Sequence, residues 1–190
     1  MSTIDLNQWQ QLEYHDPEFV LKRLREIEFK YQDYEIDPKI RNLRTNRLRP
    51  HREGRQAALF CYGMGILKGR KVWFAPFEAS DYDFIALCED KGTACYVPIQ
   101  LKELVPESAN PNAELNELIG NLRKYNSPQL TVAIYLNRTT RIKFEKLECE
   151  NLNLAEIWLF GSNTPDQTSW LLYGDLLTNP IPTEFVYPEP

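Results

Sequence analysis

The segment from Glu78 to Lys102, with the sequence EASDYDFIALCEDKGTACYVPIQLK, constrains the fold of this chain more than any other. Two apolar stretches flank a polar run that contains Lys91-Gly92, which is typical of a two-residue turn. With this turn, Asp83 at the head of the first strand faces Gln100 on the second. The segment therefore predicts a β-hairpin that brings Asp83 and Gln100 together, whereas a register slip of one residue would separate them.

Lys102 follows Gln100 by two residues, so strand alternation puts both side chains on one side while Leu101 points into the core. An acid, a neighbouring acceptor and an adjacent lysine suit a divalent cation that polarises a phosphodiester. Asp83 is also compatible with a plain strand-edge acid, and Lys102 with an exposed lysine at a strand end. The pattern therefore gives a candidate site and leaves a structural role for each residue open.

These residues resemble the PD-(D/E)xK nuclease superfamily, which has the restriction-endonuclease-like fold. Asp83 matches the metal-binding aspartate, and Gln100-Leu101-Lys102 matches the tripeptide, with glutamine where the acid is usual. The resemblance covers roughly residues 50 to 137. It implies a nuclease that hydrolyses nucleic-acid phosphodiesters with Mg²⁺ or Mn²⁺, with Asp83, Gln100 and Lys102 in its catalytic site.

The same resemblance implies cation ligands beyond the hairpin. Asp83 and the Leu101 carbonyl would bind the cation together with an acid from an upstream helix. Glu53 is the best-placed acid, although a glutamate in a first helical turn also suits the helix dipole. Glu78 and Asp81 are the substitutes, and the neutral amide of Gln100 would weaken cation binding because it brings no charge.

The charge of the chain is unevenly distributed. The formal net charge is −5, yet residues 39 to 55 hold seven basic residues and one acid. Such asymmetry predicts a basic patch that contacts the phosphate backbone of a nucleic acid, most simply DNA. A solvated arginine-rich linker is the alternative. The arginines expected to bind nucleic acid are Arg41, Arg44, Arg47, Arg49, Arg52 and Arg55.

Hydrophobic periodicity predicts an α/β (α+β) fold, with a central mixed sheet covered by helices on both faces. Residues 1–50 are expected to form an N-terminal helix and the basic segment, residues 51–137 the nuclease-like core, and residues 138–190 further strands that complete the same domain. The expected helices are 17–35, 53–67 and 112–125, and the expected strands outside the hairpin are 71–75 and 130–136. The segments 142–144, 154–160 and 170–173 are expected to form two or three further strands or a short helix, and the proline-rich tail 180–190 is expected along the surface.

Two other functions fit the same sequence. One is a catalytically inactive member of the same fold that binds nucleic acid or a protein partner. The other is a small interaction or immunity-type protein with a purely structural hairpin, in which Trp158, Trp170 and Tyr173 supply an interface. A homodimer is compatible with either. The segment Asn121 to Tyr125 faintly resembles the Gln-x-x-x-Tyr helix of some recombination nucleases, but Tyr125 is interpreted as a packing residue.

The remaining features are those of an ordinary globular chain. No apolar run approaches the length of a membrane span, so a cytoplasmic location without a membrane partner is expected. The four cysteines contain no C-x-x-C pair and are expected to be free thiols rather than zinc ligands. Two of them, Cys88 and Cys95, are expected to face each other across the hairpin.

Overall fold

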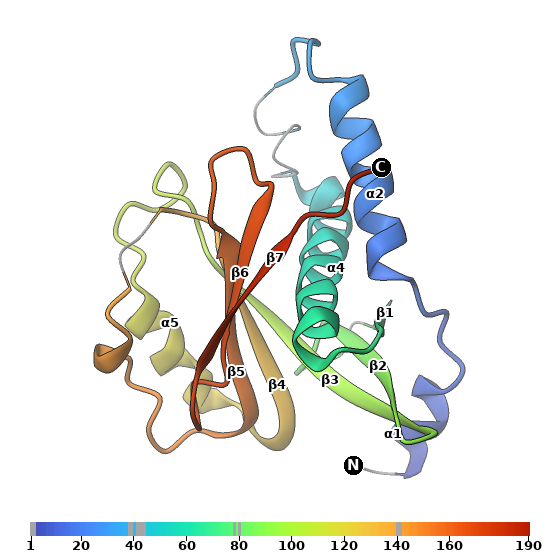
Figure 1. Ribbon diagram of the computed structural model, residues 1–190. Coiled ribbons are helices and arrows are strands. Elements are labelled where there is room, and N and C mark those ends of the chain that lie inside the picture. Colours follow the sequence, from blue (N-terminus) through green and yellow to red (C-terminus); the bar gives the residue numbers. More distant parts are fainter. Residues whose placement is uncertain (1–2, 38–39, 41–44, 78, 80, 140–141) are drawn as a thin grey trace.

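Seven strands form one curled sheet in the part of the chain that the structure describes (Figure 1). This computed structural model covers residues 1–190 and describes all of them except 1–2, 38–39, 41–44, 78, 80 and 140–141. Each strand pairs with the next one along the chain; β3–β4 and β4–β5 are parallel and the other pairs antiparallel. The strands are β1 (Val72–Pro76), β2 (Phe84–Asp90), β3 (Thr93–Leu104), β4 (Asn126–Leu136), β5 (Asn153–Ser162), β6 (Ser169–Gly174) and β7 (Ile181–Val186).

The predicted hairpin is formed by β2 and β3, and its register is confirmed. Asp90 pairs with Thr93, and the ladder continues to the pair Phe84–Ile99 at the open end. Lys91 and Gly92 have φ values of 50° and 80°, the left-handed conformation that a two-residue hairpin turn requires. The turn chemistry therefore sets which residues of β2 and β3 lie opposite each other.

Helices cover both faces of the sheet, so the predicted mixed α/β class is confirmed. The helices α2 (Pro17–Lys30) and α4 (Arg49–Lys68) lie on one side of the sheet and the short α5 (Leu115–Gly120) lies on the other (Figure 1). A further helix, α1 (Thr3–Trp9), precedes α2, and three 3-10 segments cover Asn46–Leu48, Asn121–Lys124 and Phe144–Lys146.

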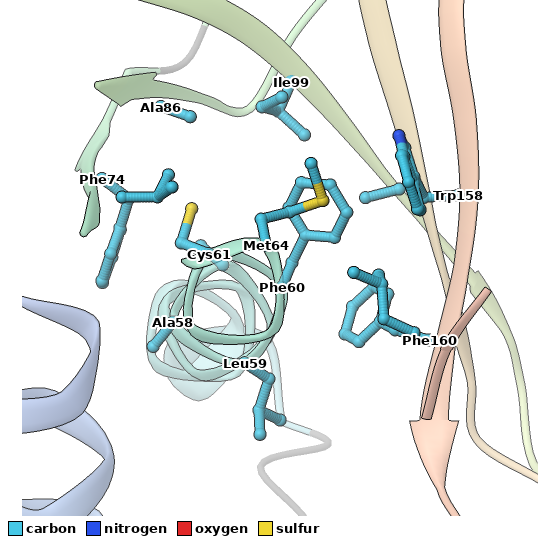
Figure 2. Close-up of a cluster of buried hydrophobic side chains, with 14 of the residues drawn as sticks. Ala58, Leu59, Phe60, Cys61, Met64, Phe74, Ala86, Ile99, Trp158 and Phe160 are labelled. Atoms are coloured by element: carbon cyan, nitrogen blue, oxygen red, sulfur yellow. The ribbon is translucent and has the colours of Figure 1, made fainter. Parts of the chain in front are cut away.

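Helix α4 supplies the larger hydrophobic core. Its residues from Gln56 to Cys61 are all buried, and Figure 2 shows Phe60 and Cys61 pointing from the helix toward the strands. Phe60 contacts Phe160 of β5 with ring centroids 5.8 Å apart. The helix begins at Arg49, one turn before the predicted start at Glu53, because proline is tolerated in a first helical turn. Three arginines of the basic segment are therefore helical.

The opposite face of the sheet holds a second core. Ile119 and Leu122 are buried against β4 and β5, as the predicted amphipathic pattern requires. The predicted helix 112–125 is shorter than expected, since α5 passes into the 3-10 segment after Gly120. The predicted stop at Ser127-Pro128 lies inside β4 instead, at an irregularity in its pairing with β5. This early part of β4 places Tyr125 directly beside the sheet.

Helix α2 starts where predicted and ends early. The Asp16 carboxylate accepts a hydrogen bond from the Glu18 N–H at 3.0 Å and caps the helix. The helix ends at Lys30 and not at residue 35. Ile27 and Phe29 are 54% and 56% exposed, so the last turns bury little apolar surface. Without tertiary packing a helical segment is only marginally stable, which explains the early end.

The C-terminal third differs most from the prediction. The tail was expected along the surface, and most of its residues are exposed, but it also forms the edge strand β7 beside β6. Its Tyr187 is buried, with the hydroxyl donating to the Leu21 carbonyl at 3.1 Å. Trp158 and Trp170 are 3% and 0% exposed, so the prediction that they supply an interface is wrong. Burial of these large aromatic side chains is what closes the sheet around α4.

Of the three segments predicted as two or three strands or a short helix, 154–160 and 170–173 lie in strands and 142–144 does not. The last residue of this segment, Phe144, opens a 3-10 helix, and its ring stacks on Tyr173 with centroids 3.8 Å apart. A tertiary aromatic contact therefore decides the local structure.

Candidate active site

Asp83 lies at the open end of the hairpin, one residue before β2. Its N–H donates to the Ile99 carbonyl at 2.9 Å, and its Oδ2 atom accepts from the Leu101 N–H at 2.7 Å. The strand ladder ends at Phe84, so the Asp83 carboxylate takes the place of a backbone acceptor for Leu101. These contacts hold the carboxylate beside Gln100, as the predicted register requires.

Gln100 is 5% exposed, and both ends of its amide are hydrogen-bonded. Nε2 donates to the Asp83 carboxylate and, at 3.1 Å, to the Leu101 carbonyl. Oε1 accepts from the Tyr125 hydroxyl at 3.0 Å. The orientation of the amide follows from its neighbours, since two oxygen acceptors face one end and the Tyr125 hydroxyl faces the other. Gln100 therefore presents its nitrogen, and not its oxygen, to Asp83.

Tyr125 joins this network from the end of the 3-10 segment that follows α5. The Nζ atoms of Lys102 and Lys124 lie 5.4 Å and 5.1 Å from its ring centroid. The interpretation of Tyr125 as a packing residue was incomplete, because the buried ring also presents its hydroxyl to Gln100.

Glu53 approaches the hairpin from α4. A cavity of about 340 Å³ is lined by Glu53, Asp83 and Leu101, together with Arg49 one turn earlier on the helix. The Arg49 Nε atom lies 2.7 Å from Glu53 Oε1. The structure therefore brings two of the predicted acids, Asp83 and Glu53, to the walls of one cavity, with the positively charged side chain of Arg49 beside them.

Burial perturbs the two central charges in opposite directions. Desolvation raises the pKa of Asp83; the Leu101 N–H and the Lys102 ammonium lower it, and Glu53 raises it. Desolvation lowers the pKa of Lys102, while Asp83 acts in the opposite direction and Arg49 adds to the lowering. The charges of Asp83 and Lys102 therefore interact with each other, and both interact with the charged residues Arg49 and Glu53 of α4. Coupled and desolvated charges at a cavity are typical of functional sites.

Three arginines of the basic segment, Arg49, Arg52 and Arg55, have acidic or amide partners. Arg52 Nε lies 3.9 Å from Glu103 Oε2. Arg55 lies 3.3 Å from Glu28 and donates to the Gln167 side chain at 2.8 Å. Arg47 is exposed, whereas Arg41 and Arg44 lie outside the described residues. The acid partners compensate part of the positive charge that the sequence predicted for a nucleic-acid surface.

The fit of a divalent cation depends on which oxygens face the cavity. Within the described ranges no group of three His, Cys, Asp or Glu side chains is arranged to hold a metal. The Gln100 oxygen accepts from Tyr125 and the Leu101 carbonyl accepts from Gln100, while Glu78 lies outside the described residues. Asp83 and Glu53 remain, and Mg²⁺ is commonly held by one or two carboxylates with waters and substrate phosphate. These two carboxylates are the oxygen donors that the cavity offers to such a cation, whereas the Gln100 oxygen is turned toward Tyr125.

The Tyr125–Gln100 contact predicts a stability effect. Replacing Tyr125 with phenylalanine leaves the buried Gln100 oxygen without its donor. We expect the free energy of unfolding in urea to fall by about 1–3 kcal/mol, the cost of an unsatisfied buried polar group. The control is Tyr173→Phe, whose ring stacks on Phe144 outside this network. Equal losses in both variants would contradict the role assigned to the Tyr125 hydroxyl.

Comparison with protein-family models, with curated proteins and with solved structures gave no significant match. In the residues that the structure describes, no helix combines the length and apolar character needed to cross a membrane.

Proposed function

We propose that this protein is a nuclease of restriction-endonuclease-like architecture, which hydrolyses nucleic-acid phosphodiesters with Mg²⁺ or Mn²⁺. One observation carries the proposal: a desolvated aspartate is coupled to a desolvated lysine, beside a cavity that also receives Glu53 from α4. The order of elements supports it, since α4 precedes β1, β2 and β3, and α5 and β4 follow.

Asp83 and Glu53 at this cavity, and Lys102, which lines a neighbouring cavity on the other face of β3, have separate roles in this proposal. Asp83 and Glu53 would hold the cation, which supplies an activated water and polarises the scissile phosphate. Lys102 places a positive charge where negative charge develops at phosphorus. Gln100 is a positioning residue that fixes the Asp83 carboxylate through its amide nitrogen, and Tyr125 fixes Gln100.

The substrate approaches along the first turns of α4. Arg49 lines the cavity, and Arg52 lies one turn further along the same helix with a 26% exposed side chain. Contacts from these guanidinium groups to backbone phosphates would carry no sequence information but would set the position of the strand. Binding is therefore expected to weaken with added salt, and DNA is the proposed substrate.

The pKa shifts predict a pH window for cleavage. The reaction needs an ionised Asp83 and a protonated Lys102. Because the pKa of Asp83 is raised, activity is lost on the acid side at a higher pH than an ordinary aspartate gives. Because the pKa of Lys102 is lowered, activity is lost on the alkaline side at a lower pH than an ordinary lysine gives.

The pH dependence of kcat/KM, measured below cation saturation, reports both limits, since it follows the groups of the free enzyme. A bound cation would itself lower the pKa of Asp83, which is why saturation must be avoided. An acid limb at or below the ordinary aspartate pKa would contradict a desolvated Asp83 as the essential group.

Cleavage of labelled oligonucleotides tests the function directly. Single- and double-stranded DNA and RNA are incubated with the full-length protein and Mg²⁺, Mn²⁺ or EDTA, beside an Asp83→Asn variant purified in parallel. This substitution keeps the size of the side chain but removes its charge. We expect cation-dependent cleavage by the wild type alone. Absence of cleavage on every substrate, or equal cleavage by the variant, would refute the proposal.

A second function is favoured by the amide of Gln100. Its nitrogen donates a hydrogen bond that stabilises the Asp83 carboxylate without any cation, which suits a catalytically inactive nucleic-acid-binding protein of the same architecture. The discriminating result is a salt-dependent shift of DNA mobility that is unaffected by EDTA and occurs without cleavage.

A further inference from the structure

Cys88 on β2 and Cys95 on β3 lie directly opposite each other across the hairpin. Both thiols are free and half-buried. Strand alternation puts both side chains on the α4 face of the sheet, together with Phe84 and Val97, which pack into the larger core. Because the turn at Lys91-Gly92 sets the register, the two cysteines are held as neighbours.

The pairing pattern places the two cysteines within reach of a disulfide. Hydrogen-bonded and non-hydrogen-bonded pairs alternate along an antiparallel ladder, and the pair Asp90–Thr93 beside a two-residue turn is hydrogen-bonded. Cys88–Cys95 lies two pairs further along and is therefore also a hydrogen-bonded pair. The same count makes Ile85–Pro98 a non-hydrogen-bonded pair, as a residue without an N–H requires. Cα atoms of hydrogen-bonded pairs lie about 5.5 Å apart, inside the range of roughly 4.4–6.8 Å that disulfides span.

We propose that Cys88 and Cys95 are a thiol-oxidation site, which forms a reversible cross-strand disulfide by exchange with a low-molecular-weight disulfide such as oxidised glutathione. The thiolate of one cysteine attacks a sulfur of the reagent and releases one glutathione thiolate. The second cysteine thiolate attacks the protein sulfur of this mixed disulfide and expels the other glutathione. Two protein thiols are oxidised and one disulfide is reduced to two thiols, so atoms and electrons balance.

The bond is expected to be easily reduced. Side chains of directly opposed strand residues have Cβ atoms about 4.5–5.5 Å apart, and hydrogen-bonded pairs lie at the long end of this range. A disulfide prefers about 3.5–4.5 Å, so closing it strains the hairpin. Strained disulfides are the labile ones, which suits reversible oxidation better than a permanent crosslink.

The other two cysteines are placed differently. Cys61 is completely buried on α4, with its side chain in the core between the helix and the sheet (Figure 2). Cys149 packs with the second core, on the opposite face of the sheet. Burial also raises the pKa of the Cys88 thiol, so exchange is slow at neutral pH and accelerates as the pH rises toward thiolate formation.

The sequence makes the crosslink easy to locate. Cleavage after lysine and arginine puts each of the four cysteines in a different peptide, and the cut at Lys91 separates Cys88 from Cys95. The folded protein is incubated with oxidised glutathione at pH 8, alkylated after acid quench, and digested. We expect the peptides Val72–Lys91 and Gly92–Lys102 to be recovered joined, and to separate completely after dithiothreitol.

Two serine variants complete the test. Cys95→Ser should leave Cys88 as a glutathione mixed disulfide, whereas Cys149→Ser should leave the joined peptides unchanged. The wild-type map decides the question even where a variant folds poorly. Recovery of Cys88 and Cys95 both alkylated, a Cys61–Cys88 crosslink, or a disulfide-linked dimer as the main product would overturn the proposal.

Discussion

Replacing Lys102 with alanine is expected to reduce kcat for phosphodiester cleavage by about 10²- to 10⁴-fold with little change in KM. The ammonium of Lys102 is desolvated and coupled to the Asp83 carboxylate, so its charge is weakly screened where the phosphate would react. An interaction used mainly in the transition state lowers kcat when it is lost. Single-turnover cleavage of a labelled duplex measures the effect.

Lys124, the other lysine over the Tyr125 ring, gives a matched control. Lys124 also lies over the Tyr125 ring, at 5.1 Å, but it comes from the 3-10 segment, whereas Lys102 is the lysine whose charge lowers the pKa of Asp83. Lys124→Ala should therefore keep kcat near the wild-type value. Lys102→Arg should recover part of the activity, since it keeps the charge on a differently shaped group. Equal losses for Lys102→Ala and Lys124→Ala would contradict a specific role of Lys102.

Replacing Gln100 with glutamate is expected to destabilise the protein at pH 8 without a divalent cation by about 2–3 kcal/mol, the value of a hydrogen bond to a charged group. Glutamate has the size of glutamine but brings a second carboxylate to the place where the amide nitrogen now donates to Asp83. Two carboxylates at this separation cannot both ionise freely, so the folded pair holds a proton with a raised pKa.

The sign of the pH effect follows from this raised pKa. The cost to the Gln100→Glu variant is largest above the raised pKa and disappears as the pH falls through it, where the two carboxyls share a proton. A cation should have the same effect, because the second carboxylate adds a charged oxygen ligand to those of Asp83 and Glu53. We expect Mn²⁺ to bind at least about tenfold more tightly to the variant, since even outer-shell partners change metal affinity by that factor.

Thermal unfolding with and without Mn²⁺ checks both expectations, and Gln100→Leu is the control. Leucine removes the amide and adds no charge, so it should lose stability without gaining any response to the cation. If glutamate and leucine behave alike, Asp83 and Gln100 do not lie at a cation-binding position. If only the Gln100→Glu variant responds to Mn²⁺, the wild-type site is the inactive one of the second proposed function.

Local signals predicted the part of the site that lies on one hairpin. The turn at Lys91-Gly92 and the even spacing of Gln100 and Lys102 were enough for the register and the shared face, because both depend on neighbouring residues. Burial of Leu101 followed from the same alternation and is observed. The contact of Asp83 with the Leu101 N–H needed only the end of that ladder.

Contacts between distant segments were not predictable from these signals. The Tyr125 hydroxyl reaches Gln100 because α5 and the 3-10 segment after it pack on β4 and β5, which no local pattern specifies. Arg55 looked like a free basic residue until the fold brought Glu28 and Gln167 to it. The proline-rich tail was predicted to lie along the surface, yet its Tyr187 is buried against α2 and belongs to the larger core. Composition reports solvent preference on average, whereas tertiary packing decides single cases.

The most direct test of the central claim compares cleavage by four proteins: the wild type, Asp83→Asn, Lys102→Ala and the double variant. Residues that act as one catalytic unit are strongly non-additive, so the double variant should cleave about as slowly as the slower single variant. Cleavage by the wild type should also require Mg²⁺ or Mn²⁺ and stop in EDTA. Equal rates in all four preparations would mean that Asp83 and Lys102 are not an active site.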